Sequence, residues 1–172
     1  DATREFKHAN VTVTVAGGVL PSPVTYTNIA TVTTIEELQA ALDAAKAGDN
    51  LIRFGADLEG NATIKQADKQ NIILDGCGKK FNGVITVNGD GHSTGAETLT
   101  FTGINFETTY SDTNDKNKWN FITAPSKIDG KYNYSHNVTI ENCTFTNTVT
   151  DNYMVGSAAF TGTYNLVMRK CR

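Results

Sequence analysis

Apolar residues recur at a helical spacing in one stretch of the chain, residues 34–47. Thr34 suits the N-cap position, and Glu37 three residues later completes a capping box. Gly48 suits the position at which a helix ends. The apolar side chains between these signals follow a period of about 3.6 residues and so share one face: Ile35, Leu38, Ala41, Leu42 and Ala45. The pattern predicts one amphipathic helix over residues 34–47.

Most of the remaining chain alternates apolar and polar residues at period 2 in short runs, as half-buried strands do. Val11, Val13 and Val15 alternate with threonine before a turn signal at Gly17-Gly18, and residues 1–33 are predicted to be an extended lead-in or attachment segment. Beyond Gly48 the pattern predicts only short strands, at residues 51–54, 62–64, 71–74, 84–87, 99–101, 119–122, 138–140, 154–155 and 166–168.

A degenerate seven-residue repeat links four of these strands, with starts at Asn71, Thr98, Asn137 and Asn165 that lie 27, 39 and 28 residues apart. The sixth position holds Gly76, Gly103 or Asn142, which tolerate a left-handed bend, whereas Lys170 departs from the pattern. Such a bend would turn the seventh residue inward. The second, fourth and seventh positions are apolar and are predicted to face a core: Ile72, Leu74, Cys77, Leu99, Phe101, Ile104, Val138, Ile140, Cys143, Leu166, Met168 and Cys171.

Single strands this short bury little surface, but stacked coils of them can share a core when equivalent segments pair in parallel about 4.8 Å apart. The segment 36–49 resembles the N-terminal capping helix of pectate-lyase-like proteins, and segments 71–78 and 137–145 resemble their coils. The resemblance covers about residues 34–172. It implies an all-β fold, a right-handed parallel β-helix with an N-terminal capping α-helix. Because the sequence stops directly after a strand-like segment, we expect further coils beyond Arg172.

The composition agrees with this fold and argues against some classes of binding partner. The chain is rich in threonine and asparagine and has 15 glycines, which favour strands and turns. A net charge of −3 without a basic stripe makes nucleic acid an unsuitable partner. No apolar run approaches the roughly 18 residues of a membrane span.

The three cysteines have no metal-ligand spacing, so we expect neither a metal site nor a cofactor. Cys143 and Cys171 occupy the same repeat position on neighbouring coils. That placement is compatible with a ladder of buried thiols and also with a disulfide.

Two polar loops, residues 108–118 and 125–136, lie within the longest repeat interval and are the candidate ligand site. Their aromatic side chains would stack on sugar rings, and their carboxylates would bind cations or sugar hydroxyls. Solvated insertions whose aromatic residues pack on the outside of the coils would have the same composition. The candidate ligand residues are Tyr110, Asp112, Asp115, Trp119, Asp129, Tyr132 and Tyr134.

The candidate catalytic elements are weak, and no catalytic residue is predicted. Resemblance to pectate lyases would imply clustered calcium-binding aspartates with an arginine or lysine base, and resemblance to polygalacturonases an aspartate pair with His-Gly and Arg-Ile-Lys elements. Neither set occurs in the sequence. Asp75 is interpreted as a turn residue, His92 as part of a polar loop, and Glu141 with Arg169 as a surface ion pair.

These observations predict a non-catalytic extracellular binding or structural module of a bacterial cell-surface protein or a phage fibre or tailspike. Its ligand would be a cell-surface or dietary polysaccharide, and analogy with β-helix fibres suggests a homotrimer. The alternative is a polysaccharide lyase or glycoside hydrolase with its active site in coils beyond Arg172. A purely structural spacer is a third class. The expected location is extracellular, at a cell surface or in a virion.

Overall fold

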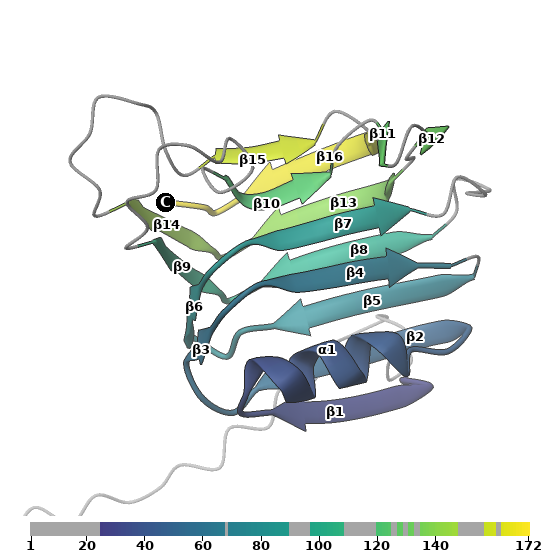
Figure 1. Cartoon of the computed structure of the whole chain (residues 1–172), viewed down its shortest axis with the longest axis horizontal. Helices are drawn as coiled ribbons and strands as arrows, with labels where there is room; N and C mark the ends of the chain where they lie inside the picture. The colour runs from purple at the N-terminus through teal and green to yellow at the C-terminus, as the bar shows by residue number, and fades with distance from the viewer. Residues whose placement is uncertain are drawn as a thin grey trace, which may run out of the picture.

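The structure is a computed structural model that describes residues 25–67, 69–89, 97–108, 120–124, 127–128, 131–132, 135–147, 157–160 and 163–172. Most of these residues form strands that stack into a parallel β-solenoid (Figure 1). The predicted strands at residues 11–15 and 154–155 lie outside the described residues.

Three parallel sheets form the walls of the solenoid. Sheet A has six strands in the order β1 (Asn28–Val32), β2 (Gly48–Phe54), β5 (Gln70–Asp75), β8 (Thr98–Thr102), β13 (Ser135–Glu141) and β16 (Thr163–Arg169). Sheet B contains β3 (Leu58–Glu59), β6 (Lys80–Asn82), β9 (Asn105–Thr108) and β14 (Thr144–Asn147). Sheet C contains β4 (Ala62–Gln66), β7 (Ile85–Gly89), β10 (Asn120–Ala124) and β15 (Ser157–Phe160).

The chain visits sheets A, B and C in turn, so each coil consists of three strands, as in β2–β3–β4 and β5–β6–β7. Within the three sheets every pairing of neighbouring strands is parallel. The predicted parallel β-helix is therefore confirmed. A short antiparallel pair, β11 (Lys127–Ile128) and β12 (Lys131–Tyr132), stands apart from the three sheets.

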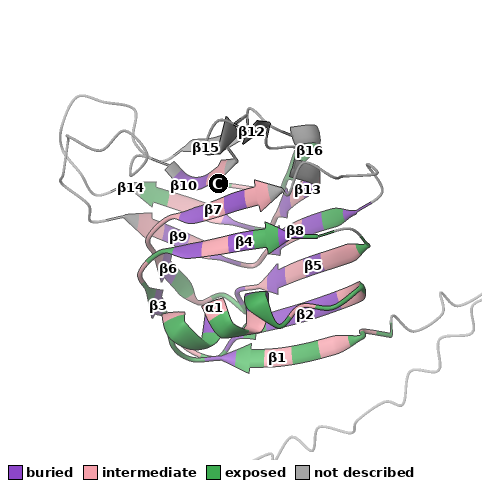
Figure 2. Cartoon of the chain, turned by 45° about the vertical axis from the view of Figure 1, so that its right-hand side comes forward, coloured by how far each residue is buried: buried purple, intermediate pink, exposed green. Residues whose placement is uncertain are grey.

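The inward positions of sheet A form the core, as the repeat predicted (Figure 2). The six predicted core residues of β5, β8 and β13 are buried, and their strands pair in the predicted register: Ile72, Leu74, Leu99, Phe101, Val138 and Ile140. Leu166 and Met168 keep this register on β16 but are 44% and 50% exposed, so their predicted burial is wrong. The reason is that β16 is the end strand of sheet A and has a neighbouring coil on one side only.

A stack of phenylalanines fills the interior beside sheet B. Phe81 and Phe106 are paired residues of β6 and β9, and their ring centroids are 6.0 Å apart. Phe106 also stacks on Phe145, at 5.1 Å and almost parallel, and packs against Phe121 of sheet C at 5.7 Å. Because aromatic contacts of this kind add to the energy of burial, the stack ties sheets B and C together.

The bend after each sheet A strand uses a left-handed residue, but its position shifts by one in the first repeat. The φ angles of Gly103, Asn142 and Lys170 are 62°, 53° and 54°, whereas in the first repeat the positive φ falls on Cys77 rather than on Gly76. The thiol of Cys77 is exposed, so its predicted inward position is wrong. Gly76 lies beneath Ile104 instead, where a Cβ atom would approach the Ile104 Cγ1 atom to 2.7 Å.

The helix α1 (Ile35–Asp43) is shorter than predicted and closes the first coil. Thr34 caps it by accepting a hydrogen bond from the Glu37 amide, while the Glu37 carboxylate accepts from the Thr33 amide and hydroxyl. These bonds from Thr33 lower the pKa of Glu37. Leu38 and Leu42 are buried in the same cluster as the side chains of β2 and β4.

The same helix protects the edge of sheet C. The Gln39 side-chain amide acts like a strand backbone: its Nε2 donates to the Thr63 carbonyl at 3.0 Å, and its Oε1 accepts from the Thr63 amide at 2.8 Å. Thr63 lies in β4, the end strand of sheet C. The helix is therefore a cap, as predicted, and it works partly through one side chain.

Replacing Gln39 with alanine should lower the free energy of unfolding by about 1–3 kcal/mol, because the Thr63 amide and carbonyl lose their partners. The bared edge should also promote aggregation. Urea unfolding and light scattering would measure both effects. Glu36→Ala, at an exposed position of the same helix, is the matched control. It should change neither the free energy of unfolding nor the tendency to aggregate. A Gln39→Ala protein as stable and as monomeric as the parent would show that the amide pair protects nothing.

Candidate functional site

The loop residues predicted as a ligand site are not brought together by the described part of the structure. Tyr110, Asp112, Asp115, Trp119, Asp129 and Tyr134 lie outside the described residues. Tyr132 ends the short strand β12, and the position of its side chain also lies outside the description. This site stays a prediction.

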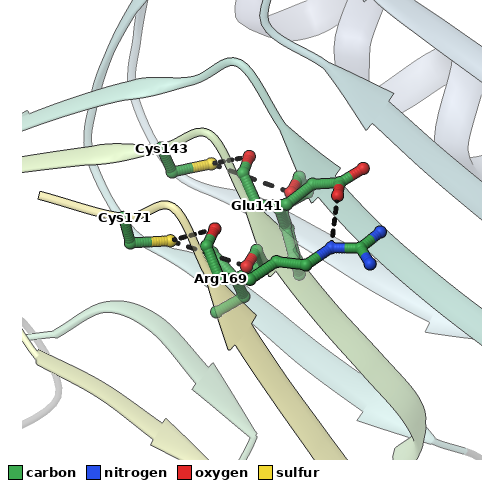
Figure 3. A network of polar contacts seen from close by, with 6 residues as sticks. Glu141, Cys143, Arg169 and Cys171 are labelled. Atoms are coloured by element: carbon green, nitrogen blue, oxygen red, sulfur yellow. Dashed lines mark hydrogen bonds and ion pairs between the residues drawn. The ribbon is translucent and has the colours of Figure 1, made fainter.

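The outward face of sheet A carries a regular row of charged and polar residues. Arg53, Asp75, Thr102, Glu141 and Arg169 align on successive strands. Arg169 Nε lies 2.6 Å from Glu141 Oε2 (Figure 3), and Arg53 Nε lies 3.7 Å from Asp75 Oδ2. The predicted Glu141–Arg169 ion pair is confirmed. Since both arginines are largely exposed, these pairs contribute little to stability and form no enclosed site.

The candidate site lies instead on the outward face of sheet B. A shallow hollow of about 280 Å³ spans three successive coils there, and its lining combines three carboxylates, one ammonium group, one amide and one leucine: Asp57, Leu58, Glu59, Lys80, Asn82 and Glu107. The alternation of each strand explains this arrangement. Phe81 and Phe106 point into the core, so their neighbours in sequence point outward.

Lys80 organises the hollow. Its Nζ lies 2.7 Å from Glu107 Oε2, and its backbone amide donates to Asp57 Oδ1 at 2.8 Å. The hydrogen bond to Glu107 and the charge of that carboxylate raise the pKa of Lys80, so its ammonium stays protonated at neutral pH. Lys80 is therefore a fixed positive charge and a hydrogen-bond donor, and it is unsuited to act as a general base.

The hollow offers polar groups that complement sugar hydroxyls. Asp57 and Glu59 are exposed and present carboxylate oxygens as acceptors, while Asn82 is half-buried and supplies an amide that both donates and accepts. Among the described residues, no group of three or more histidine, cysteine, aspartate or glutamate side chains is placed to hold a metal ion. The polar groups of the hollow can thus form hydrogen bonds with a polar ligand.

Sequence reasoning missed this site because the strands of sheet B are short: the alternation resumes at Phe106 and Phe145, but so few positions do not define a strand. None of β3, β6, β9 and β14 was predicted. The 27-residue interval of the first two repeats would not have aligned this site, because β6 and β9 pair at an interval of 25 residues, with Lys80 opposite Asn105 and Phe81 opposite Phe106.

The cysteines form no disulfide in the structure, and all three are free. Cys143 is buried, and its Sγ donates to the carbonyls of Glu141 at 3.3 Å and Phe101 at 3.7 Å. Burial raises the pKa of Cys143 to about 11. Of the two alternatives for this thiol, the interior ladder is the one observed.

Comparison with protein-family models, with curated proteins and with solved structures finds no match to this chain. Within the described residues, no helix has the length and apolar character needed to cross a membrane. The chain is thus identified by its architecture, as a parallel β-solenoid with a helical cap.

Proposed function

We propose that this β-helix is a non-catalytic glycan-binding module and that the hollow on sheet B is its binding surface. The observation that carries the proposal is the recurrence of outward polar groups on three successive coils. Asp57 and Glu59 come from the first of these coils, Lys80 and Asn82 from the second, and Glu107 from the third. A β-helix places such groups about 4.8 Å apart, a spacing that suits an extended chain of sugar units.

The sequence adds candidate ligand residues directly after the strand that carries Glu107. Strand β9 ends one residue beyond Glu107, and the first polar loop, which contains Tyr110 and leads to Trp119, follows directly. Carboxylates that accept from hydroxyls, next to aromatic side chains that stack on sugar rings, form a usual combination for glycan recognition. Three carboxylates against one ammonium favour neutral glycans over polyuronates, because an anionic ligand would be repelled.

The proposed host protein and ligand class are supported by the resemblance to pectate-lyase-like proteins. In this proposal the module belongs to an extracellular protein of a bacterial surface or to a phage fibre, and it contacts cell-surface or dietary polysaccharide. A homotrimer is the proposed assembly, by analogy with other β-helix fibres.

Glu107→Gln should weaken the binding of a neutral oligosaccharide roughly tenfold, because it removes a charge-assisted acceptor and releases Lys80. The matched control is Glu141→Gln, the same change on sheet A, which should leave affinity unaltered. Trp119→Ala should also weaken binding without lowering the melting temperature. Calorimetric titration of each variant with glycans selected on an array measures these effects. Binding that is equal in Glu107→Gln and Glu141→Gln would remove the hollow as the ligand site.

The alternative is that the natural protein cleaves polysaccharide, as a lyase or a glycoside hydrolase. The same glycan panel tests it, with and without calcium, by release of reducing ends or unsaturated products. Cleavage that disappears on replacing one carboxylate would overturn the non-catalytic proposal. General acid–base chemistry needs groups with matched pKa values within hydrogen-bond reach of one substrate atom, and the raised pKa of Lys80 argues against that role for it.

A further inference from the structure

Two thiols occupy equivalent places on neighbouring coils. Each follows a left-handed residue, Asn142 with φ 53° before Cys143 and Lys170 with φ 54° before Cys171. The two strands that lead into them, β13 and β16, pair in parallel, with Glu141 opposite Arg169. The register therefore places Cys143 directly opposite Cys171, and Figure 3 shows their sulfur atoms pointing the same way.

The hydrogen bonds of the two thiols repeat one another by one coil. Cys143 Sγ donates to the carbonyl two residues before it and to Phe101 of the coil below, at 3.3 and 3.7 Å. Cys171 Sγ donates to the carbonyl two residues before it and to Ile140 of the coil below, at 3.4 and 3.5 Å. One cysteine is thus related to the other by the translation between neighbouring strands, about 4.8 Å. That separation lies within the Cα–Cα range of disulfides, roughly 4.4–6.8 Å.

We propose that Cys143 and Cys171 form an oxidisable pair whose disulfide would link two neighbouring coils of the β-helix. In the reduced structure their side chains are parallel, so closing the bond requires one of them to rotate toward the other. The spacing of the two strands already lies within the disulfide range, so the strands need not approach.

The solvent exposure of each thiol determines which cysteine reacts first with the oxidant. Cys171 is partly exposed and reacts first: its thiolate attacks one sulfur of a small disulfide such as oxidised glutathione and expels one glutathione thiolate. The buried Cys143, as its thiolate, then attacks the Cys171 sulfur of the mixed disulfide and expels the second. The two cysteines lose two protons and two electrons, and glutathione disulfide is reduced to two glutathione thiols.

The experiment uses the full chain carrying Cys77→Ser, which removes the exposed third thiol and leaves the pair intact. The folded protein is incubated with oxidised glutathione and mapped by mass spectrometry without reduction. We expect a peptide cross-linked through Cys143 and Cys171. The melting temperature should rise by roughly 5 °C through closure of the loop between the two cysteines and should return to its starting value with dithiothreitol.

Starting from the preformed mixed disulfide at Cys171, bridge closure should accelerate about tenfold per pH unit between pH 7 and 9. Burial raises the pKa of Cys143 to about 11, so its thiolate fraction grows with pH throughout this range. The control Cys77→Ser/Cys143→Ala should stop at the glutathione adduct. An adduct that persists on Cys171 with Cys143 present, or a bridge that forms only in urea, would overturn the proposal.

Discussion

Phe106→Ala should lower the free energy of unfolding by about 3–5 kcal/mol, the largest single loss we expect from truncating a core side chain. Phe106 is fully buried, and its ring contacts Phe81 of the coil below, Phe145 of the coil above and Phe121 across the interior. Removing it leaves a cavity at the centre of the stack, which neighbouring coils held by strand pairing cannot fill. Urea unfolding monitored by circular dichroism measures the change.

The matched control for this variant is Thr146→Ala, at an exposed position opposite Glu107 on the outside of the same sheet. Its effect should stay within about 0.5 kcal/mol. A loss below 1 kcal/mol for Phe106→Ala would mean that the coils close around the cavity and that the aromatic stack does not tie sheets B and C together.

Gly83→Ala should destabilise the protein by about 3 kcal/mol through overpacking of the turns that join sheets B and C. A Cβ atom on Gly83 would lie 1.9 Å from the carbonyl oxygen of Gly60, which belongs to the equivalent turn one coil below. The two turns are held by hydrogen bonds from the Gly60 amide to the Asn82 carbonyl and from the Ala62 amide to the Val84 carbonyl. Separating the backbones would break both bonds.

Gly55→Ala is the control for this substitution. Its Cβ would lie 3.1 Å from the methyl groups of Thr31 and Thr33, whose exposed side chains can rotate, and 3.4 Å from the Val32 carbonyl oxygen, which is an ordinary contact. The expected loss is below about 1 kcal/mol. Comparison of the two melting curves distinguishes a backbone clash from a general cost of replacing glycine, and equal curves would contradict the stacked-turn explanation.

The two stability predictions also bear on the proposed function. Phe106 and Glu107 are adjacent in β9, one facing the core and the other the hollow. The aromatic stack therefore fixes the strand that presents Glu107 and holds it 2.7 Å from Lys80. A binding surface made in this way is rigid, because its side chains stand on strands that are hydrogen-bonded to the coils on either side.

Sequence periodicity predicted sheet A well because its strands are long enough to show alternation. The segments that start at Asn71, Thr98, Asn137 and Asn165 pair in the predicted register, and Asn165 Nδ2 donates to Asn137 Oδ1 across the last pair. The capping helix was also predicted, since capping and amphipathic signals are local. Sheet B left only a weak trace, the alternation that resumes at Phe106 and Phe145, because strands of two to four residues contain too few positions to define a period.

The sequence by itself determined that the chain coils, which residues of sheet A face inward, and that one helix precedes the coils. The repeat also predicted the outward Glu141–Arg169 pair of sheet A. Only the tertiary structure decided which outward residues of sheet B meet, because that depends on how many residues each turn uses. It gathered Asp57, Lys80 and Glu107 into one hollow, and it moved Cys77 outward by shifting a bend by a single residue. A local hydrophobic period shows only whether a side chain lies on the inner or the outer face of its own strand. The neighbours of a side chain on the coils above and below are set by turn geometry and stacking, which no local period encodes.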